Sequence, residues 1–357
     1  MNGGDTLGKN KLMKAKEKGL FIISLDFELN WGVHDVFKGN QYAENLSGTR
    51  EAIDQMLELF KRYQIHATWA TVGMLFFDSK QELLQHLPME KPAYINRDFS
   101  PYEKLDEIGE NEKEDPYHYG ASIIKKIHSF PNQEIGTHTF SHYYCLEQGQ
   151  TIEQFEADLK ASIQIKKSFG HPVKSIVFPR NQLNNAYLDI CEKHGIQSYR
   201  GNERSWIYKE SKFHKESALK RAIRLADSYI NITGHNTYPI KEVEKEPVIN
   251  LPSSRFLRPY NTNFKGLEKL RLKRIKNSIA HAARKGEVYH LWWHPHNFGK
   301  NVKENFQFLQ EILQLVDEFV RQGSLCSLNM EEAAELVYVK KEAAIYEKVF
   351  PQSQYET

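Results

Sequence analysis

Two histidines spaced four residues apart are candidate metal ligands. His138 and His142 occur in the segment GTHTFSHY, residues 136–143. If a helix begins near Thr139, both imidazoles lie on one face, about one turn apart. Two ring nitrogens at that separation can reach one metal ion at about 2 Å each. Such a pair also occurs on surfaces and in cores, so its position relative to the strands decides between these interpretations.

Two carboxylates occupy the end of an early apolar segment. Asp26 ends the run LFIISLD, and Glu28 follows two residues later. On an extended chain the two side chains share a face. Their repulsion favours different roles, in which one carboxylate ligates a metal and the other is a base. The alternative is a pair of loop caps.

Two more segments end in polar residues of the same kind. Arg180 and Asn181 follow the apolar run SIVFP, and His294 and His296 follow the run YHLWW. A guanidinium beside a carboxylate holds that carboxylate ionised. Two histidines and one carboxylate form the ligand set of a catalytic zinc site with an open position. A second carboxylate and a further histidine supply a base and an acid.

The elements that must position these residues alternate along the chain. Strands are predicted over residues 20–26, 66–73, 134–139, 174–179, 196–201, 287–294 and 324–328. Helices are predicted over residues 47–63, 151–169, 185–194, 265–285, 303–321 and 331–347. This alternation predicts an α/β fold with a parallel sheet. About seven strands fit a (β/α) barrel, in which active sites lie at the carboxyl ends of the strands. No GxGxxG segment follows a predicted strand, so a dinucleotide site has no support.

The chain is interpreted as one domain over residues 20–335, with an N-terminal tail over 1–19 and a C-terminal helix and tail over 336–357. Two polar stretches, about 79–118 and 202–262, are predicted insertions over the barrel mouth. The helix predicted over 265–285 holds eight Lys or Arg residues against one acid. Either this helix presents a solvated face, or it contacts a phosphate or an anionic lipid surface.

Composition excludes several classes of protein. The 357 residues contain 48 Lys plus Arg and 46 Asp plus Glu, a net charge of +2 that argues against a nucleic-acid binder. Three scattered cysteines are too few for a disulfide framework and argue against a zinc site held by thiolates. No apolar run reaches about 18 residues and none opens the chain, which predicts neither a membrane-spanning helix nor a secretory signal. The expected location is the cytoplasm; the oligomeric state is open.

In order along the chain, these motifs resemble the polysaccharide deacetylase (NodB-homology) family, carbohydrate esterase family 4. Asp26 and Glu28 resemble its acidic motif, although Phe27 separates them and the second acid is Glu. His138, Thr139 and His142 match its H-[ST]-x-x-H motif. Residues 178–180 and 291–294 resemble its arginine motif and its late histidine motif. The nearest counterpart of its Asp-Trp motif is the stretch 200–206.

The resemblance implies a deformed (β/α) barrel that removes N-acetyl groups from an amino sugar in a polysaccharide, a lipid-linked glycan or a nucleotide-linked glycan. It implies that Glu28, His138 and His142 hold Zn²⁺ or another divalent transition metal. Asp26 is then the base, Arg180 holds Asp26 ionised, and His294 protonates the departing amine. Candidate substrate contacts are Trp31, Tyr143, Asn181, Trp293 and His296, although the aromatic residues fit the core equally well.

Two alternatives remain open at this point. A related barrel hydrolase could open a cyclic amide with the same acid pair and histidines. A glycan-binding pseudo-enzyme could keep the barrel and lack turnover, and the departures at Glu28 and at residues 178–182 are its support.

Overall fold

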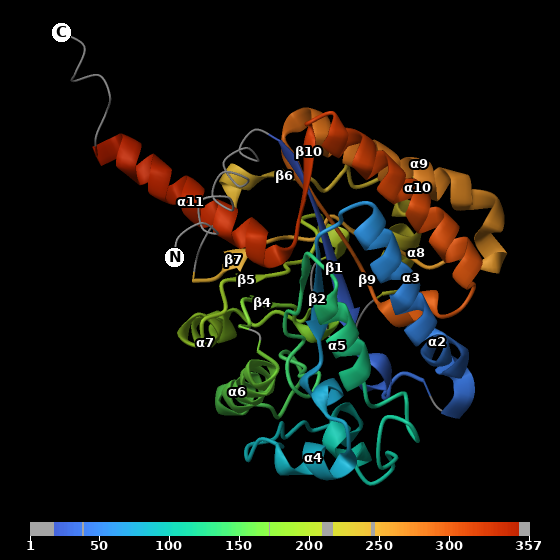
Figure 1. Ribbon diagram of the computed structural model, residues 1–357, viewed down its shortest axis with the longest axis vertical. Coiled ribbons are helices and arrows are strands. Elements are labelled where there is room, and N and C mark those ends of the chain that lie inside the picture. The colour runs from blue at the N-terminus through green and yellow to red at the C-terminus, as the bar shows by residue number, and fades with distance from the viewer. Residues whose placement is uncertain (1–17, 38, 171, 209–216, 244–246, 350–357) are drawn as a thin grey trace.

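The computed structural model describes residues 18–37, 39–170, 172–208, 217–243 and 247–349. Its central strand is β1 (Gly19–Phe27), which is buried along its whole length. On one edge β1 pairs in parallel with β9 (Glu287–Trp293), and on the other with β2 (Ala67–Thr71) and β10 (Leu325–Leu328). Strands buried on both faces require largely apolar runs, which β1 and β9 have. Figure 1 shows β1 and β9 side by side in the middle of the molecule.

From β2 the pairing continues through short strands. Thr137 bridges Thr71 on one side and Ile176 on the other. Ile176 belongs to β4 (Ser175–Ile176), which pairs with β5 (Ser198–Tyr199). The predicted strand over 134–139 is therefore shorter in the structure. It consists of β3 (Gln133–Glu134) and the bridges of Thr137, because the chain enters a loop from His138 onward.

One continuous segment leads the pairing back to β9. β7 (Ile249–Asn250) pairs with β5, and β8 (Arg255–Phe256) pairs with β9 a few residues later. The strands therefore follow one another around a deformed (β/α) barrel, as predicted. β6 (Tyr238–Pro239) adds an antiparallel partner to β9. Residues 249–256 lie in the second predicted insertion, but the structure places them in the barrel wall.

Helices cover the outside of the strands. The α-helices are α2 (Ala43–Ser47), α3 (Thr49–Arg62), α4 (Lys80–Gln85), α5 (Ala121–Ser129), α6 (Ile152–Ser168), α7 (Leu188–Lys193), α8 (Ala218–Asp227), α9 (Glu268–Lys285), α10 (Val302–Arg321) and α11 (Met330–Val349). α6 begins with the predicted cap, since Thr151 and Gln154 form a capping box. α9 ends at Gly286, whose φ of 66° is the left-handed conformation that glycine adopts most easily.

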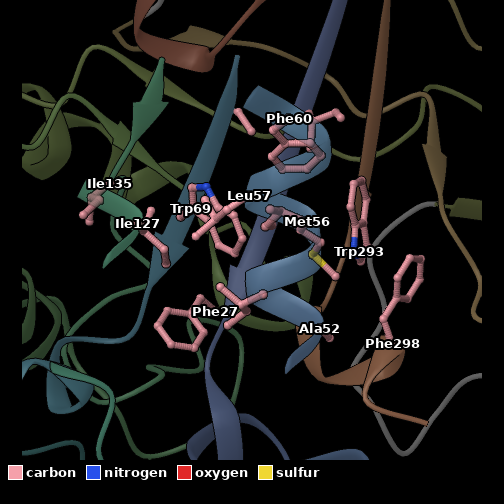
Figure 2. Packing of buried hydrophobic residues seen from close by; sticks show 14 of the residues in the cluster. Phe27, Ala52, Met56, Leu57, Phe60, Trp69, Ile127, Ile135, Trp293 and Phe298 are labelled. Atoms are coloured by element: carbon pink, nitrogen blue, oxygen red, sulfur yellow. The ribbon is translucent and has the colours of Figure 1, made fainter. Parts of the chain in front are cut away.

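The main core lies between the strands and α3. Met56, Leu57 and Phe60 share the apolar face of α3 and are at most 1% exposed. Figure 2 shows them packed among Phe27, Trp69 and Trp293, which come from β1, β2 and β9. Odd-numbered residues of β1 face this helical layer, so its even-numbered residues face the barrel interior.

Several sequence predictions concern the periphery of the fold. In the basic helix α9, Arg271 pairs with Glu268, Arg274 lies 3.6 Å from Asp227, and Lys276 lies 3.0 Å from Glu311. Three of the cations of α9 are therefore close to acidic side chains of the protein itself. Among the described residues, no helix has the length and hydropathy needed to cross a bilayer. Most of the predicted N-terminal tail and residues 350–357 lie outside the described part of the chain.

Candidate active site

Polar side chains line the interior end of β1 and β9. Ser24 and Asp26 face inward from β1, and so do His290 and Trp292 of β9, which are in register with Ile22 and Ser24. His290 lies 2.8 Å from the Ser24 hydroxyl through Nε2. These positions alternate with the apolar residues that face the helices, so the strand period alone directs them to one cavity wall.

Glu28 and the two histidines of the predicted motif come together beyond the end of β1. Glu28 Oε2 lies 3.0 Å from His142 Nε2 and 3.3 Å from His138 Nε2. One ligand atom of each of these three buried residues lies within 4.8 Å of the other two. Glu28 immediately precedes a short 3-10 helix, η1 (Leu29–Gly32), and a β-carbon on Gly32 would lie 2.0 Å from the Glu28 carboxyl carbon. Gly32 therefore makes room for this carboxylate.

The loop that holds the histidines is not the predicted helix. Thr139 and His142 have φ values of 62° and 55°, which are left-handed and incompatible with a continuing α-helix. Asp158, buried on α6, shapes this loop by accepting hydrogen bonds from the backbone N–H groups of Phe140 (2.6 Å) and Ser141 (3.1 Å). It also accepts one from the Ser141 hydroxyl. Burial raises the pKa of the Asp158 carboxyl to about 6.

The donor set fits a divalent transition metal. His138 Nδ1 lies 2.8 Å from the Val177 carbonyl oxygen, which selects the tautomer with the proton on Nδ1. Its Nε2 is buried and, apart from the approach of Glu28 Oε2 to 3.3 Å, has no hydrogen-bond partner among the described residues. Burial lowers the pKa of His142 to about 4, although Glu28 opposes this shift. At neutral pH, His142 therefore keeps a lone pair for a metal. Burial by itself raises the pKa of Glu28, but the neighbouring imidazoles of His294, His142 and His138 bring it well below its ordinary value, so Glu28 adds a negative charge.

Asp26 pairs with an arginine that sequence reasoning did not select. Arg200, at the end of β5, donates to both Asp26 oxygens at 2.6 and 2.8 Å and also to Asn181 Oδ1 at 2.9 Å. Burial by itself raises the pKa of the Asp26 carboxyl, but Arg200, with smaller contributions from His138 and His294, brings it below its ordinary value. Arg200 therefore makes the contact that was expected of Arg180.

Arg180 turns to a different carboxylate. Its Nη2 lies 2.6 Å from both oxygens of Asp35, and its guanidinium lies 4.4 Å from the centre of the Tyr144 ring. Arg180 and Asn181 both have positive φ values, 55° and 52°. This left-handed turn directs the two consecutive side chains to different partners, so the prediction that Arg180 holds Asp26 is wrong.

The late histidines complete the wall opposite His138 and His142. His294 Nε2 lies 3.7 Å from Asp26 Oδ2 and 3.6 Å from Glu28 Oε1, and its side chain is 25% exposed. His296 is buried, with Nε2 3.8 Å from Glu28 Oε1. Burial lowers the pKa of His296 to about 3. The partly exposed His294 is thus the one better placed to meet a substrate.

The three aromatic residues predicted to stack on a sugar are core residues. Trp31, Tyr143 and Trp293 are each 0% exposed. Trp293 faces the helical layer, where Phe298 stacks on it at 5.7 Å (Figure 2). Its neighbour Trp292 has the opposite orientation, with the Arg200 guanidinium 4.1 Å from its ring centre. Successive strand residues point to opposite faces, and Trp292 pairs with Ser24, so Trp292 shares the inward face with Ser24 and Asp26.

Four residues have roles in the site that were not predicted from the sequence. They are Gly32, Asp158, Arg200 and Trp292. Arg200 lies in the last two residues of the predicted strand 196–201, and its place at a strand end was the available signal. Asp158 lies in the middle of a helix, where no local pattern distinguishes a buried acid from an exposed one. The role of Gly32 depends on the Glu28 side chain packing directly against it, which the sequence does not show.

Comparisons with known proteins agree with the motifs. The family model described as polysaccharide deacetylase matches residues 46–199, which confirms the resemblance drawn from the sequence. The matched segment contains His138, His142 and Arg180, while Asp26, Glu28, Arg200 and His294 lie outside it. No curated protein matches the chain.

Solved structures share the fold at low sequence identity. A protein assigned to the polysaccharide deacetylases, from Mycobacterium smegmatis, is 12% identical with a TM-score of 0.53, covering 91% of this chain and 92% of its own. One with the same assignment, from Pseudomonas aeruginosa PAO1, is 10% identical with a TM-score of 0.54 and coverages of 90% and 91%. The allantoinase PuuE is 11% identical with a TM-score of 0.51 and coverages of 90% and 90%.

Proposed function

We propose, from the match of residues 46–199 to the polysaccharide deacetylase family model, that this protein is a metal-dependent hydrolase that removes N-acetyl groups from an amino sugar. The family consists of hydrolases that act on C–N bonds other than peptide bonds. The observation that carries the proposal is the convergence of Glu28, His138 and His142 opposite the Asp26–Arg200 pair and His294. The substrate is an N-acetylated polysaccharide, lipid-linked glycan or nucleotide-linked glycan.

Glu28, His138 and His142 would hold the metal, with Zn²⁺ as the ion best suited to one carboxylate and two imidazoles. When bound, the metal supplies Lewis-acid polarisation of the acetyl carbonyl and a lower pKa for a water molecule. The remaining chemistry belongs to side chains. Asp26, kept ionised by Arg200, accepts a proton from the attacking water. His294 donates a proton to the departing amine, which is a poor leaving group without it.

Asn181 and Trp292 complete this arrangement by supporting Arg200. The Asn181 amide oxygen accepts a hydrogen bond from Arg200 Nη2, and the Trp292 ring lies under the guanidinium. Arg200 is thus held from three directions, and its two hydrogen bonds orient Asp26 toward the space next to Glu28. Asn181 and Trp292 are positioning residues in this proposal.

Metal content and product release test the proposal together. Purified full-length protein should contain about one divalent transition metal per chain, measured by mass spectrometry of the elements. It should release acetate from N-acetylglucosamine oligomers, lose this activity with a chelator, and regain it when Zn²⁺ is restored. His138→Ala and His142→Ala should lose both metal and activity, whereas His86→Ala, which changes an exposed histidine on another part of the surface, should keep both.

The same assay separates the alternatives. Hydrolysis of allantoin without acetate release would establish the cyclic-amide reaction. Allantoin is a suitable test substrate because the allantoinase PuuE shares the fold. Stoichiometric metal and oligosaccharide binding with no product from any substrate would indicate a pseudo-enzyme. Protein that stays metal-free in the presence of Zn²⁺, with activity unaffected by chelator, would contradict the metal-dependent mechanism.

A further inference from the structure

α8 and the segments beside it expose large apolar side chains. Leu219 is 70% exposed, Ile230 64%, Ile232 52% and Trp206 64%. Among the residues of α8, only Asp227 is buried. Helices at the surface of a globular protein normally turn their apolar stripe toward the core. A group of exposed apolar residues of this kind is typical of an interaction surface.

The apolar and basic residues of α8 occupy different sides of the helix. Leu219, Ile223 and Ile230 follow the i, i+4 and i+11 spacing of one helical stripe. The stripe extends past the end of α8, because the Ile230 N–H donates to the Ala226 carbonyl oxygen at 2.9 Å. Lys220, Arg221 and Arg224 lie to one side of the stripe; Arg224 donates to the Ile207 carbonyl oxygen at 3.5 Å, whereas Arg221 is exposed. A basic, amphipathic helix of this kind is suited to a membrane surface.

Polar contacts fix which side of α8 faces outward. The buried Asp227 carboxylate accepts hydrogen bonds from Arg255 at 3.0 Å and from the Tyr208 hydroxyl at 2.9 Å. Arg274 of α9 donates to the Gly234 carbonyl oxygen in the following loop. The helix is therefore attached to the barrel through its polar side, which leaves the apolar stripe directed away from the core.

This surface is connected to the carboxyl-end loops that carry the candidate site. Trp206 begins η8 (Trp206–Tyr208), which follows β5 and Arg200. Between them, Glu203 accepts a hydrogen bond from Trp292 Nε1 at 3.4 Å. After β8, Arg258 donates to the Ser228 hydroxyl at 2.9 Å, directly beyond α8. Docking through this surface would therefore bring the edge that carries the site close to the docked layer.

We propose that the α8 surface, which we define as Trp206, Leu219, Arg221, Ile230 and Ile232, binds the surface of a bilayer that contains anionic lipid. The aliphatic side chains enter the boundary between headgroups and acyl chains, and Trp206 occupies the headgroup level, where indole rings are favoured. Arg221, an exposed cation of α8, interacts with the anionic headgroups. This charge makes anionic lipid the matching occupant. The inference goes beyond the proposed function, since binding requires no turnover.

Co-sedimentation of the full-length protein with vesicles tests this proposal. Binding should be at least tenfold stronger to vesicles of phosphatidylcholine with phosphatidylglycerol than to phosphatidylcholine alone, and should weaken in high salt. The double variant Leu219→Ser/Ile230→Ser should lose at least tenfold in binding, and Arg221→Gln about fivefold. Met89→Ser is the matched control, because Met89 is 98% exposed and lies outside this surface.

Each other outcome overturns the proposal. Equal binding by the double variant and the control would show that lipid contacts the protein elsewhere. If the native protein does not bind anionic vesicles, a lipid bilayer is not the partner of this surface. Self-association in analytical ultracentrifugation that the double variant abolishes, without vesicle binding, would assign the surface to a second copy of this chain. Acetate release from a soluble oligomer should be unchanged in the double variant, so failure of docking and failure of the proposed hydrolysis are distinguished.

Discussion

Asp26 and Arg200, 174 residues apart in the chain, form a buried ion pair with hydrogen bonds of 2.6 and 2.8 Å. Arg200 also donates to Ser24, on the same strand as Asp26, at 3.1 Å. Its guanidinium thus joins β5 to β1 at the carboxyl end of the barrel. The pair supplies an ionised carboxylate directly beside the histidine and glutamate cluster.

Replacing Arg200 should shift the pH dependence of hydrolysis. In Arg200→Gln, burial still raises the pKa of Asp26, but the guanidinium that lowers it is gone, so the acidic limb of kcat/KM moves to higher pH. Activity at neutral pH should fall at least 100-fold. Full pH profiles of the native protein and the variant measure this shift.

Arg180→Gln is the matched control for that experiment, because Arg180 pairs with Asp35 instead of Asp26. Its acidic limb should remain in place.

The stability of Arg200→Gln should also fall, by about 3–5 kcal/mol for an unpaired buried charge. A depressed Asp26 pKa stabilises the native fold above the unfolded value of about 3.9, and this contribution is lost as pH falls through the folded pKa. An unchanged pH profile in Arg200→Gln would contradict the role given to this arginine.

Replacing His294 should separate proton donation from metal binding. His294→Gln should lower kcat for amide substrates by about 10²- to 10⁴-fold, since the amine then leaves without a general acid. Metal content should not change. Hydrolysis of p-nitrophenyl acetate should be affected much less, because its leaving group requires no proton. Equal losses on both substrates would argue against His294 as the acid.

Replacing Asp158 should weaken metal binding from a distance. Asp158→Asn disturbs the hydrogen bonds to the Phe140 and Ser141 backbone that shape the histidine loop, so metal affinity should fall about 10- to 100-fold. Competition with a chromogenic chelator measures this affinity. Glu153→Gln, an exposed change on the same helix, should leave it intact. Native affinity in Asp158→Asn would show that the loop keeps its shape without the carboxylate.

A close backbone contact supports the loop that carries His294 and His296. A β-carbon on Gly48, which precedes α3, would lie 2.0 Å from the Gly299 carbonyl oxygen, just after that loop. Gly48→Ala should therefore destabilise the fold by about 1–3 kcal/mol. It should also lower kcat by displacing His294, with the metal retained. Urea denaturation and acetate release measure the two effects.

Gly266→Ala is the control for the glycine experiment, because nothing lies within 4 Å of a β-carbon added there. Its stability and activity should match those of the native protein. If Gly48→Ala behaves in the same way, the contact between the two loops has no role in positioning the site.

The sequence by itself determined the main strands and helices, the resemblance to the polysaccharide deacetylase family and the three residues of the candidate metal site, because these depend on local features. The runs 20–26 and 287–294 are apolar enough to be central strands, and a pair such as His138 and His142 is visible from its spacing alone. Their location after strand ends then follows from the alternation of elements.

Tertiary structure alone decided which distant side chains are partners. Arg180 follows one predicted strand and Arg200 lies at the end of another, and only the left-handed turn at Arg180 directs the first to Asp35 and leaves Asp26 to the second. Trp292 and Trp293 are adjacent in sequence, and their faces became known only when β9 was paired with β1. Spacing along the chain determines local geometry, but contacts between strands and loops depend on the packing of the whole barrel.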